Sequence, residues 1–176
     1  MSEALPLMLK ELRLPAFGQY YKDYQDRASE HAWSYSQYLS VLCEQEVAQR
    51  FQSRISSWTH EAKLPRGKSF ATLAPNDLPQ AVQKKIIALR DNTHWAHQAD
   101  NILLIGPSGV GKSHIAAALG LHLIEQGIRV KWITATALVQ HLQQAKKDQE
   151  LMTALTRMDK YRLMVLDDRG YVKKTY

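Results

Sequence analysis

The sequence predicts an α/β fold, in which a parallel sheet with flanking helices follows a small helical N-terminal region. Three observations lead to this prediction. Residues 102–105, 129–134 and 163–166 form short strand-like runs, and the segments between them have apolar residues every three or four positions. Residues 1–62 show helical spacing alone. A chain of 176 residues with 45% apolar content suffices for one ordinary domain and part of another.

Three amphipathic helices are predicted in the N-terminal region. The first has its apolar face from Leu5 to Leu12 and is ended by Pro15. The second has an aromatic stripe over residues 17–28, which favours a packed core face over a base-stacking surface. The third begins at a capping box over residues 34–37 and continues to about residue 60. We expect the apolar stripes of the three helices to pack against each other or against a neighbour. The stripe of the third helix consists of Tyr35, Leu39, Leu42, Cys43, Val47, Phe51, Ile55 and Trp58.

The regular spacing breaks down after residue 62. Four Pro and Gly residues interrupt residues 63–80, which indicates a linker or strap whose Lys63, Arg66 and Lys68 either contact DNA phosphates or are solvated. Asp77 is expected to cap a helix that buries Ile86. We therefore divide the chain into a helical region 1–62, a strap 63–80 and an α/β domain 81–176.

Residues 106–113 match the phosphate-loop (Walker A) pattern G-x-x-x-x-G-K-[ST] in full. Its glycines allow consecutive backbone N–H groups to turn inward as an anion nest. Lys112 supplies a charge for the β- and γ-phosphates, and the helix that begins here directs its positive dipole end at the same anion. The predicted nucleotide-binding residues are Gly106, Pro107, Ser108, Gly109, Val110, Gly111, Lys112, Ser113 and His114.

The elements around the loop follow the order of an α/β domain. Residues 102–105 are expected to be a strand buried on both faces, and the helix after the loop should stop at Gly127. A second strand covers 129–134, and Thr136 is expected to cap the helix after it. A further short helix carries Leu151, Leu155 and Met158 and leads to a third strand, 163–166.

The third strand ends in two acidic residues, which is the Walker B arrangement. A buried strand of this kind delivers a carboxylate to the Mg²⁺ near the phosphate-loop hydroxyl. We therefore predict that Ser113 and Asp167 hold Mg²⁺. Asp168 stands where related ATPases often place the carboxylate that orients the attacking water, so it is the candidate catalytic residue.

Composition narrows the function classes. The formal net charge of +6 permits a DNA partner or a solvated basic surface, and the absence of a base-reading motif predicts that any DNA binding is non-specific. The single cysteine excludes an internal disulfide. We find no signal peptide and no apolar run long enough to span a bilayer, so a cytoplasmic protein without a membrane partner is expected.

The Walker segments, residues 9–15, residues 33–35 and the continuation over 168–171 together resemble the IstB-like ATP-binding proteins, which are helper ATPases encoded beside the transposase of bacterial insertion sequences. The resemblance covers nearly the whole chain, although Arg169 stands where the family more usually has Leu. It implies an AAA+ fold with ATP and Mg²⁺ as cofactors. It also implies DNA, the transposase of the same element and further copies of the chain as partners.

The resemblance also leads us to expect that the chain is truncated. Family members continue past the Walker B strand with a fourth strand, which lies between the phosphate-loop and Walker B strands, a fifth strand and an arginine that reaches a neighbour's γ-phosphate. Without these segments, ATP binding is expected but hydrolysis is expected to be impaired. The alternatives are a helicase-loader-like ATPase of replication, a non-catalytic DNA-binding module and a fragment without function.

Overall fold

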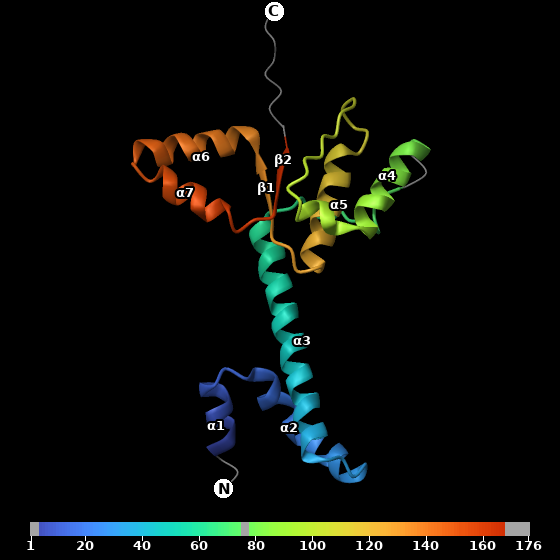
Figure 1. Ribbon diagram of the computed structural model, residues 1–176, viewed down its shortest axis with the longest axis vertical. Coiled ribbons are helices and arrows are strands. Elements are labelled where there is room, and N and C mark those ends of the chain that lie inside the picture. The colour runs from blue at the N-terminus through green and yellow to red at the C-terminus, as the bar shows by residue number, and fades with distance from the viewer. Residues whose placement is uncertain (1–3, 75–77, 168–176) are drawn as a thin grey trace, which may run out of the picture. The chain divides into compact units, whose positions relative to one another are not determined.

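The computed structural model describes residues 4–74 and 78–167. The chain forms two compact units, Met1–Arg54 and Ile55–Tyr176, and the boundary between them falls inside the long helix α3 (Figure 1). The domain limits expected from the sequence, 1–62, 63–80 and 81–176, remain predictions.

The first unit is entirely helical within its described residues. It contains α1 (Ala4–Glu11), α2 (Pro15–Glu30) and the first part of α3 (Tyr35–Ala62). Pro15 stands in the first turn of α2, where a missing N–H costs nothing. The capping box is confirmed: the Ser34 amide donates to Gln37 Oε1 at 2.8 Å, and the Gln37 amide donates to Ser34 Oγ at 3.2 Å.

A buried carboxylate joins the helices of the first unit. Glu46 on α3 is 5% exposed, and its Oε2 accepts the backbone N–H of Ala16 at 2.9 Å. Arg50 donates from Nε to Glu46 Oε1 at 2.8 Å and from Nη2 to the Arg13 carbonyl at 2.7 Å. Glu46 thus caps the N-terminus of α2 from another helix, and Arg50 compensates its buried charge.

The apolar stripe expected on α3 is mostly exposed, which corrects the expectation that the other helices of this unit cover it. Leu42 is buried, but Leu39, Cys43, Val47 and Phe51 are exposed, and Tyr35 is 94% exposed. The buried positions of α3 in this unit are Leu42 and Glu46. Helical spacing reveals that residues share a row on a helix, but a neighbouring element decides whether that row is covered.

The second unit contains the sheet. After the last turns of α3 come α4 (Gln80–Asp91), the 3₁₀ helix η2 (Thr93–Ala96), α5 (Lys112–Glu125), β1 (Val130–Thr134), α6 (Ala135–Lys147), α7 (Leu151–Met158) and β2 (Leu163–Asp167). The two strands pair in parallel, with Val130 opposite Leu163 and Thr134 opposite Asp167. In Figure 1, α5 and α4 lie on one side of this strand pair and α6 and α7 on the other.

Helix α5 forms the centre of the core of this unit. Seven of its residues are buried, and Leu123 and Ile124 pack with Val130 and Trp95. The predicted stop at Gly127 is confirmed. Gly127 has φ of +79°, and the Ile128 amide reaches back to the Leu123 carbonyl at 2.9 Å, as in a Schellman motif. The helix therefore ends where β1 must begin.

The strand expected at residues 102–105 does not form within the described residues. Leu103 and Ile105 are 80% and 84% exposed, and only Leu104 packs, against the cluster of Ile86, Ile115 and Leu119. The described sheet has two strands, and neither of them pairs with this segment. An apolar run is buried on both faces only when it has strand neighbours and layers on both sides, so the expectation of a doubly buried strand was wrong.

Two helix caps were also predicted from the sequence, at Thr136 and Asp77. Thr134, not Thr136, caps α6, because its Oγ1 accepts the Ala137 amide at 3.1 Å. The helix therefore starts directly at the carboxyl end of β1. Asp77, the expected cap of α4, lies outside the described residues. Among residues 4–74 and 78–167, none of the helices combines the length and the apolar character that crossing a membrane requires.

Candidate functional site

The loop between residue 105 and α5 folds around its own lysine. Lys112 is the first residue of α5, and its Nζ donates to the carbonyl of Gly106 at 2.8 Å and to that of Pro107 at 2.5 Å. The ammonium group therefore sits over the loop at the N-terminus of a 14-residue helix. Two positive features, the ammonium group and the helix dipole, converge on this end of α5.

The glycines of the loop serve different purposes. Gly109 and Gly111 have φ of +85° and +87°, in the left-handed region where side chains are strained. Gly106 lies outside that region. A Cβ atom on Gly106 would stand 3.3 Å from Val110 Cγ2. Glycine is therefore favoured at this position because the Val110 side chain is close, and not because of the backbone φ.

Ser113 and Asp167 come together although 54 residues separate them. Ser113 Oγ donates to Asp167 Oδ1 at 3.0 Å, and both side chains are partly buried. Ser113 stands in the first turn of α5, and Asp167 is the last residue of β2. The parallel strand thus delivers its carboxylate to the start of the phosphate-loop helix. Asp168, the expected catalytic residue, lies outside the described residues.

His114 is turned to the strap. Its Nε2 lies 3.0 Å from the Ser69 carbonyl and 3.1 Å from Thr72 Oγ1. Because a carbonyl can only accept, Nε2 carries the proton. Thr72 Oγ1 also lies 2.8 Å from the Gly67 carbonyl and accepts the Ser69 amide at 3.0 Å. The strap is thereby fastened to the residue next to Ser113.

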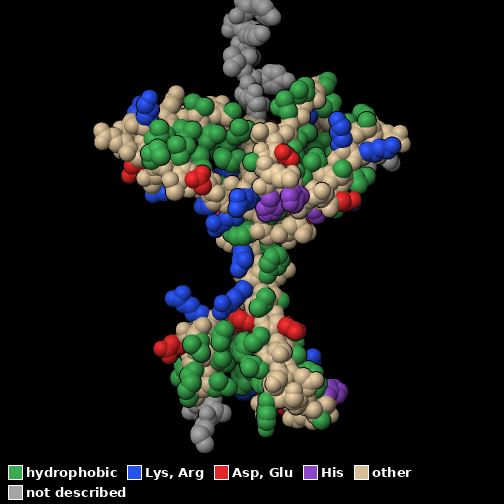
Figure 2. Space-filling view, viewed as in Figure 1, with side chains coloured by type: hydrophobic (Ala, Val, Ile, Leu, Met, Phe, Trp, Pro, Cys, Tyr) green, Lys and Arg blue, Asp and Glu red, His purple; other side chains and the backbone are tan. Residues whose placement is uncertain are grey.

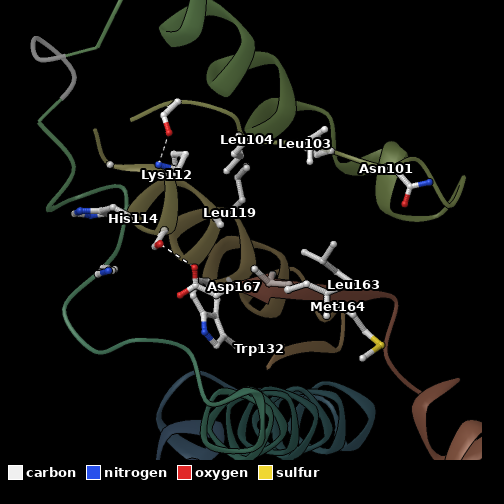
Figure 3. A pocket seen from close by; sticks show the side chains of 18 of the residues that line it. Asn101, Leu103, Leu104, Lys112, His114, Leu119, Trp132, Leu163, Met164 and Asp167 are labelled. Atoms are coloured by element: carbon white, nitrogen blue, oxygen red, sulfur yellow. Dashed lines mark hydrogen bonds between the residues drawn. The ribbon is translucent and has the colours of Figure 1, made fainter. Parts of the chain in front are cut away.

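A cavity of about 1170 Å³ lies beside the loop. Figure 3 shows Leu103 and Leu104 on one side of it and Leu163 and Met164 on the other. Of the predicted binding residues, it is lined by Gly106, Ser108, Gly109, Gly111, Lys112, Ser113 and His114, together with Asp167. Pro107 and Val110 do not line it, although the Pro107 carbonyl holds Lys112.

Other residues that the sequence did not assign to the site also line the cavity, and two of them, Lys68 and Trp132, lie far from the loop in the chain. Lys68 comes from the strap, where it was considered for DNA, and Trp132 comes from β1. No motif marks either position. The only signal was the basic character of the strap, which could not identify the surface on which it lies.

Comparison with known proteins identifies relatives over almost the whole chain. The family model described as IstB-like ATP binding protein matches residues 7–174. A Sinorhizobium fredii protein named as an insertion sequence ATP-binding protein is 39% identical over 97% of this chain and 57% of its own length. The ATP-binding protein named for insertion sequence IS5376 of Geobacillus stearothermophilus is 30% identical over 98% of this chain and 68% of its own.

A third relative also matches almost the whole chain. The protein named for insertion sequence IS21 of Pseudomonas aeruginosa is 26% identical over 96% of this chain and 63% of its own length. The chain thus spans roughly three fifths of the length of these relatives, so what the whole relatives do is not transferred to it directly.

Proposed function

The chain belongs to the IstB-like ATP-binding protein family, and on that premise we propose that it binds ATP with Mg²⁺ as a helper protein of DNA transposition. The proposed partners are duplex DNA, bound without sequence preference, and the transposase of the same element. Further copies of the chain are also proposed as partners. ATP is the part of the proposal that the geometry of the site supports best.

The observation that carries the proposal is the contact between Ser113 and Asp167. An octahedral Mg²⁺ with bonds of about 2.0–2.1 Å has adjacent ligand atoms about 3 Å apart. Ser113 Oγ and Asp167 Oδ1 are 3.0 Å apart. The hydroxyl and the carboxylate therefore fit two neighbouring positions around this ion, and both are oxygen ligands that Mg²⁺ prefers.

The residues of the loop have separate roles in the proposal. The backbone N–H groups between Gly106 and Gly111 surround the phosphates, and Lys112 exchanges its two carbonyl partners for phosphate oxygens. This exchange replaces neutral acceptors by charged ones, which strengthens each hydrogen bond. When bound by Ser113 and Asp167, Mg²⁺ would neutralise charge on the β- and γ-phosphates.

Hydrolysis is a separate step of the proposal. We assign Asp168 the orientation of the attacking water, because it directly follows the metal-binding carboxylate. Lys68, which lines the same cavity from the strap, is a further cation for the phosphates. The fastening of the strap to His114 brings Lys68 into this position.

The test is the thermal unfolding of the whole chain with ATP and Mg²⁺. A ligand that binds only the folded state stabilises it by about 2.7 kcal/mol at a concentration of 100 Kd. We expect ATP with Mg²⁺ to raise the unfolding temperature and adenosine to have little effect, because the contacts are made to phosphates. Equal stabilisation by adenosine and ATP, or none by ATP, would contradict the proposal.

A further inference from the structure

A second cluster of charged groups lies away from the phosphate loop, where α3 ends. We define the α3-end cluster as Trp58, Glu61, Arg129, Lys131, Lys160, Tyr161 and Arg162. Its members come from three places in the chain: the last turns of α3, the start of β1 and the segment before β2. Figure 2 shows Lys and Arg side chains gathered in this region of the molecule.

The cluster contains four cations and one acid. Glu61 accepts hydrogen bonds from Lys160 and, at 3.0 Å, from the Tyr161 hydroxyl, while Arg129 Nη2 lies 3.8 Å from its other oxygen. The Lys160 hydrogen bond is the main cause that lowers the pKa of Glu61, so its single negative charge is present at neutral pH. A formal excess of three positive charges remains.

Aromatic rings hold these cations in place. The guanidinium carbon of Arg129 lies 5.0 Å from the centre of the Trp58 ring. Lys160 and Lys131 both stand over the Tyr161 ring, at 4.9 Å and 5.9 Å. Each contact is a cation–π interaction. Because the two lysines share one ring, their like charges lie within about one Debye length at 0.1 M salt and repel.

Fastening the end of α3 requires fewer cations than the cluster holds. Lys131 Nζ donates to the Glu61 carbonyl at 3.0 Å, which satisfies a free acceptor at the helix end. Lys160 pairs with the Glu61 carboxylate. Arg129 and the exposed Arg162 add positive charge beyond these two contacts. The backbone of Arg162 lies beside that of Arg129, because the Arg162 amide donates to the Arg129 carbonyl at 2.9 Å. Such an excess is stabilised by an external anion.

The cluster is separate from the ATP site. Arg129 and Arg162 directly precede the paired first residues of the strands, Val130 and Leu163, whereas Asp167 ends β2 on the loop side. Parallel strands rise about 3.3 Å per residue, so the two ends of β2 lie about 13 Å apart. None of the seven cluster residues, all of which are described, lines the cavity beside the loop, although their neighbours Trp132 and Leu163 do.

We propose that the α3-end cluster binds the phosphate backbone of duplex DNA, which rests on the proposed function as a transposition helper. Closely spaced cations from several segments match the repeated phosphates of one duplex. The Trp58 and Tyr161 rings orient these cations through the cation–π contacts. Because the proposed contacts are made to phosphates, binding is independent of sequence.

The experiment measures binding of the whole chain to two duplexes of unrelated sequence over a range of salt concentrations. The test variant combines Arg129→Gln with Arg162→Gln, the two cations that exceed the contacts fastening the end of α3. The control combines Lys146→Gln with Lys147→Gln, two exposed lysines in the last turn of α6 that carry the same charge. The single variant Arg162→Gln is added because this side chain is exposed, and unfolding is followed for every variant. Binding of ATP is measured on the same samples.

Each phosphate contact contributes about 0.9 to the slope of log K against log salt concentration. The test variant is expected to lower this slope by about 2 and Arg162→Gln by about 1 on both duplexes, with the control and ATP binding unchanged. A folded test variant and Arg162→Gln that keep the parent slope overturn this inference and leave ATP binding intact. A parent chain that does not bind duplex DNA overturns both this inference and the DNA part of the proposed function.

Discussion

Lys112 is held by loop carbonyls, and Ser113 by the carboxylate of Asp167. Both contacts use groups that our proposal assigns to ATP and Mg²⁺. The nucleotide therefore meets side chains that are already at the loop, and binding exchanges partners instead of assembling the site. These internal hydrogen bonds therefore compete with the ligand for Lys112 and Ser113.

Asp167→Asn is predicted to weaken the part of ATP affinity that depends on Mg²⁺ by at least about tenfold. The amide keeps the shape of the side chain and can still accept from Ser113, but it lacks the charge that binds the metal. Titration of Mg²⁺ into the protein with a fluorescent ATP analogue measures this effect. Asp159→Asn, at the exposed end of α7, is the matched control. An unchanged Mg²⁺ dependence in Asp167→Asn would remove Asp167 from the metal site.

Glu61 is predicted to make stability depend on pH. The Lys160 hydrogen bond lowers the pKa of Glu61 below its ordinary value of 4.5. A carboxyl group with a lower pKa in the folded state stabilises it above the unfolded value, and this contribution is lost as pH falls through the folded value. Below about pH 4.5, the unfolding free energy should therefore fall more steeply for the parent than for Glu61→Gln.

Denaturant unfolding at several pH values checks this prediction. Glu44→Gln, at an exposed position on the same helix, should follow the parent. If Glu61→Gln also followed the parent through the acidic range, the pKa of Glu61 would be unshifted in solution.

At the scale of elements, the strap packs against α5. Phe70 packs edge-on against His122 at a ring distance of 6.0 Å, and the Leu64 side chain lies so near Gly120 that a Cβ atom there would meet it at 3.1 Å. Thr72 adds the polar fastening to His114. The described part of the strap therefore contacts both the middle of α5, at Gly120 and His122, and its first turn, at His114.

Thr72→Val is predicted to loosen the strap. The substitution keeps the shape but removes the hydroxyl that bonds Gly67, Ser69 and His114, at a cost of about 1 kcal/mol. Amide hydrogen exchange should speed up at residues 69–73 in the variant. ATP affinity should fall moderately, because Lys68 is positioned by this strap. Thr136→Val, exposed in the first turn of α6, should leave both unchanged. Equal protection of the strap in Thr72→Val would contradict this role.

Glu46→Ala is predicted to destabilise the first unit by about 3 kcal/mol, because it uncaps α2 and leaves Arg50 without its carboxylate partner. Circular dichroism during thermal unfolding measures the loss. Glu44→Ala removes an exposed carboxylate from the same helix and should cost much less. A variant at Glu46 as stable as this control would show that the buried carboxylate is not needed.

The elements that could be predicted from the sequence are those decided by nearby residues. The Ser34 capping box, the Gly127 stop and the strand before Asp167 each depend on a few neighbouring positions. The family match over residues 7–174 confirms the resemblance to the IstB-like family. This resemblance could be predicted because the motifs that carry it are also local. The Walker motifs also predicted that Ser113 and Asp167 would lie close together. Helix and strand propensities alone could not predict this contact, because the two residues are 54 positions apart.

The elements that could not be predicted depend on partners far away in the chain. Residues 102–105 have strand composition, yet they become a strand only if another strand pairs with them. The α3 stripe has core spacing, yet no described element covers Tyr35 and Val47. The bond between Thr72 and His114 joins positions 42 residues apart in a segment without periodicity, so the pattern contained no signal for it.

At the scale of the whole molecule, the sheet unit presents two sites at opposite ends of its strands. The carboxyl end of β2 brings Asp167 to the phosphate loop, and the amino ends hold the α3-end cluster. We propose that the loop binds a small anion, ATP, and that the cluster binds an extended one, duplex DNA. The first assignment depends on the claim that the loop around Lys112 is a nucleotide site.

Equilibrium binding of a fluorescent ATP analogue with Mg²⁺ to the parent, to Lys112→Ala and to Lys85→Ala tests this claim most directly. Lys85 is an exposed lysine of α4, so its removal changes the net charge equally. Folding of both variants is checked by circular dichroism. We predict that Lys112→Ala abolishes binding and that Lys85→Ala binds like the parent. Binding by a folded Lys112→Ala as tight as that of the parent would contradict the assignment of the phosphate loop as the nucleotide site.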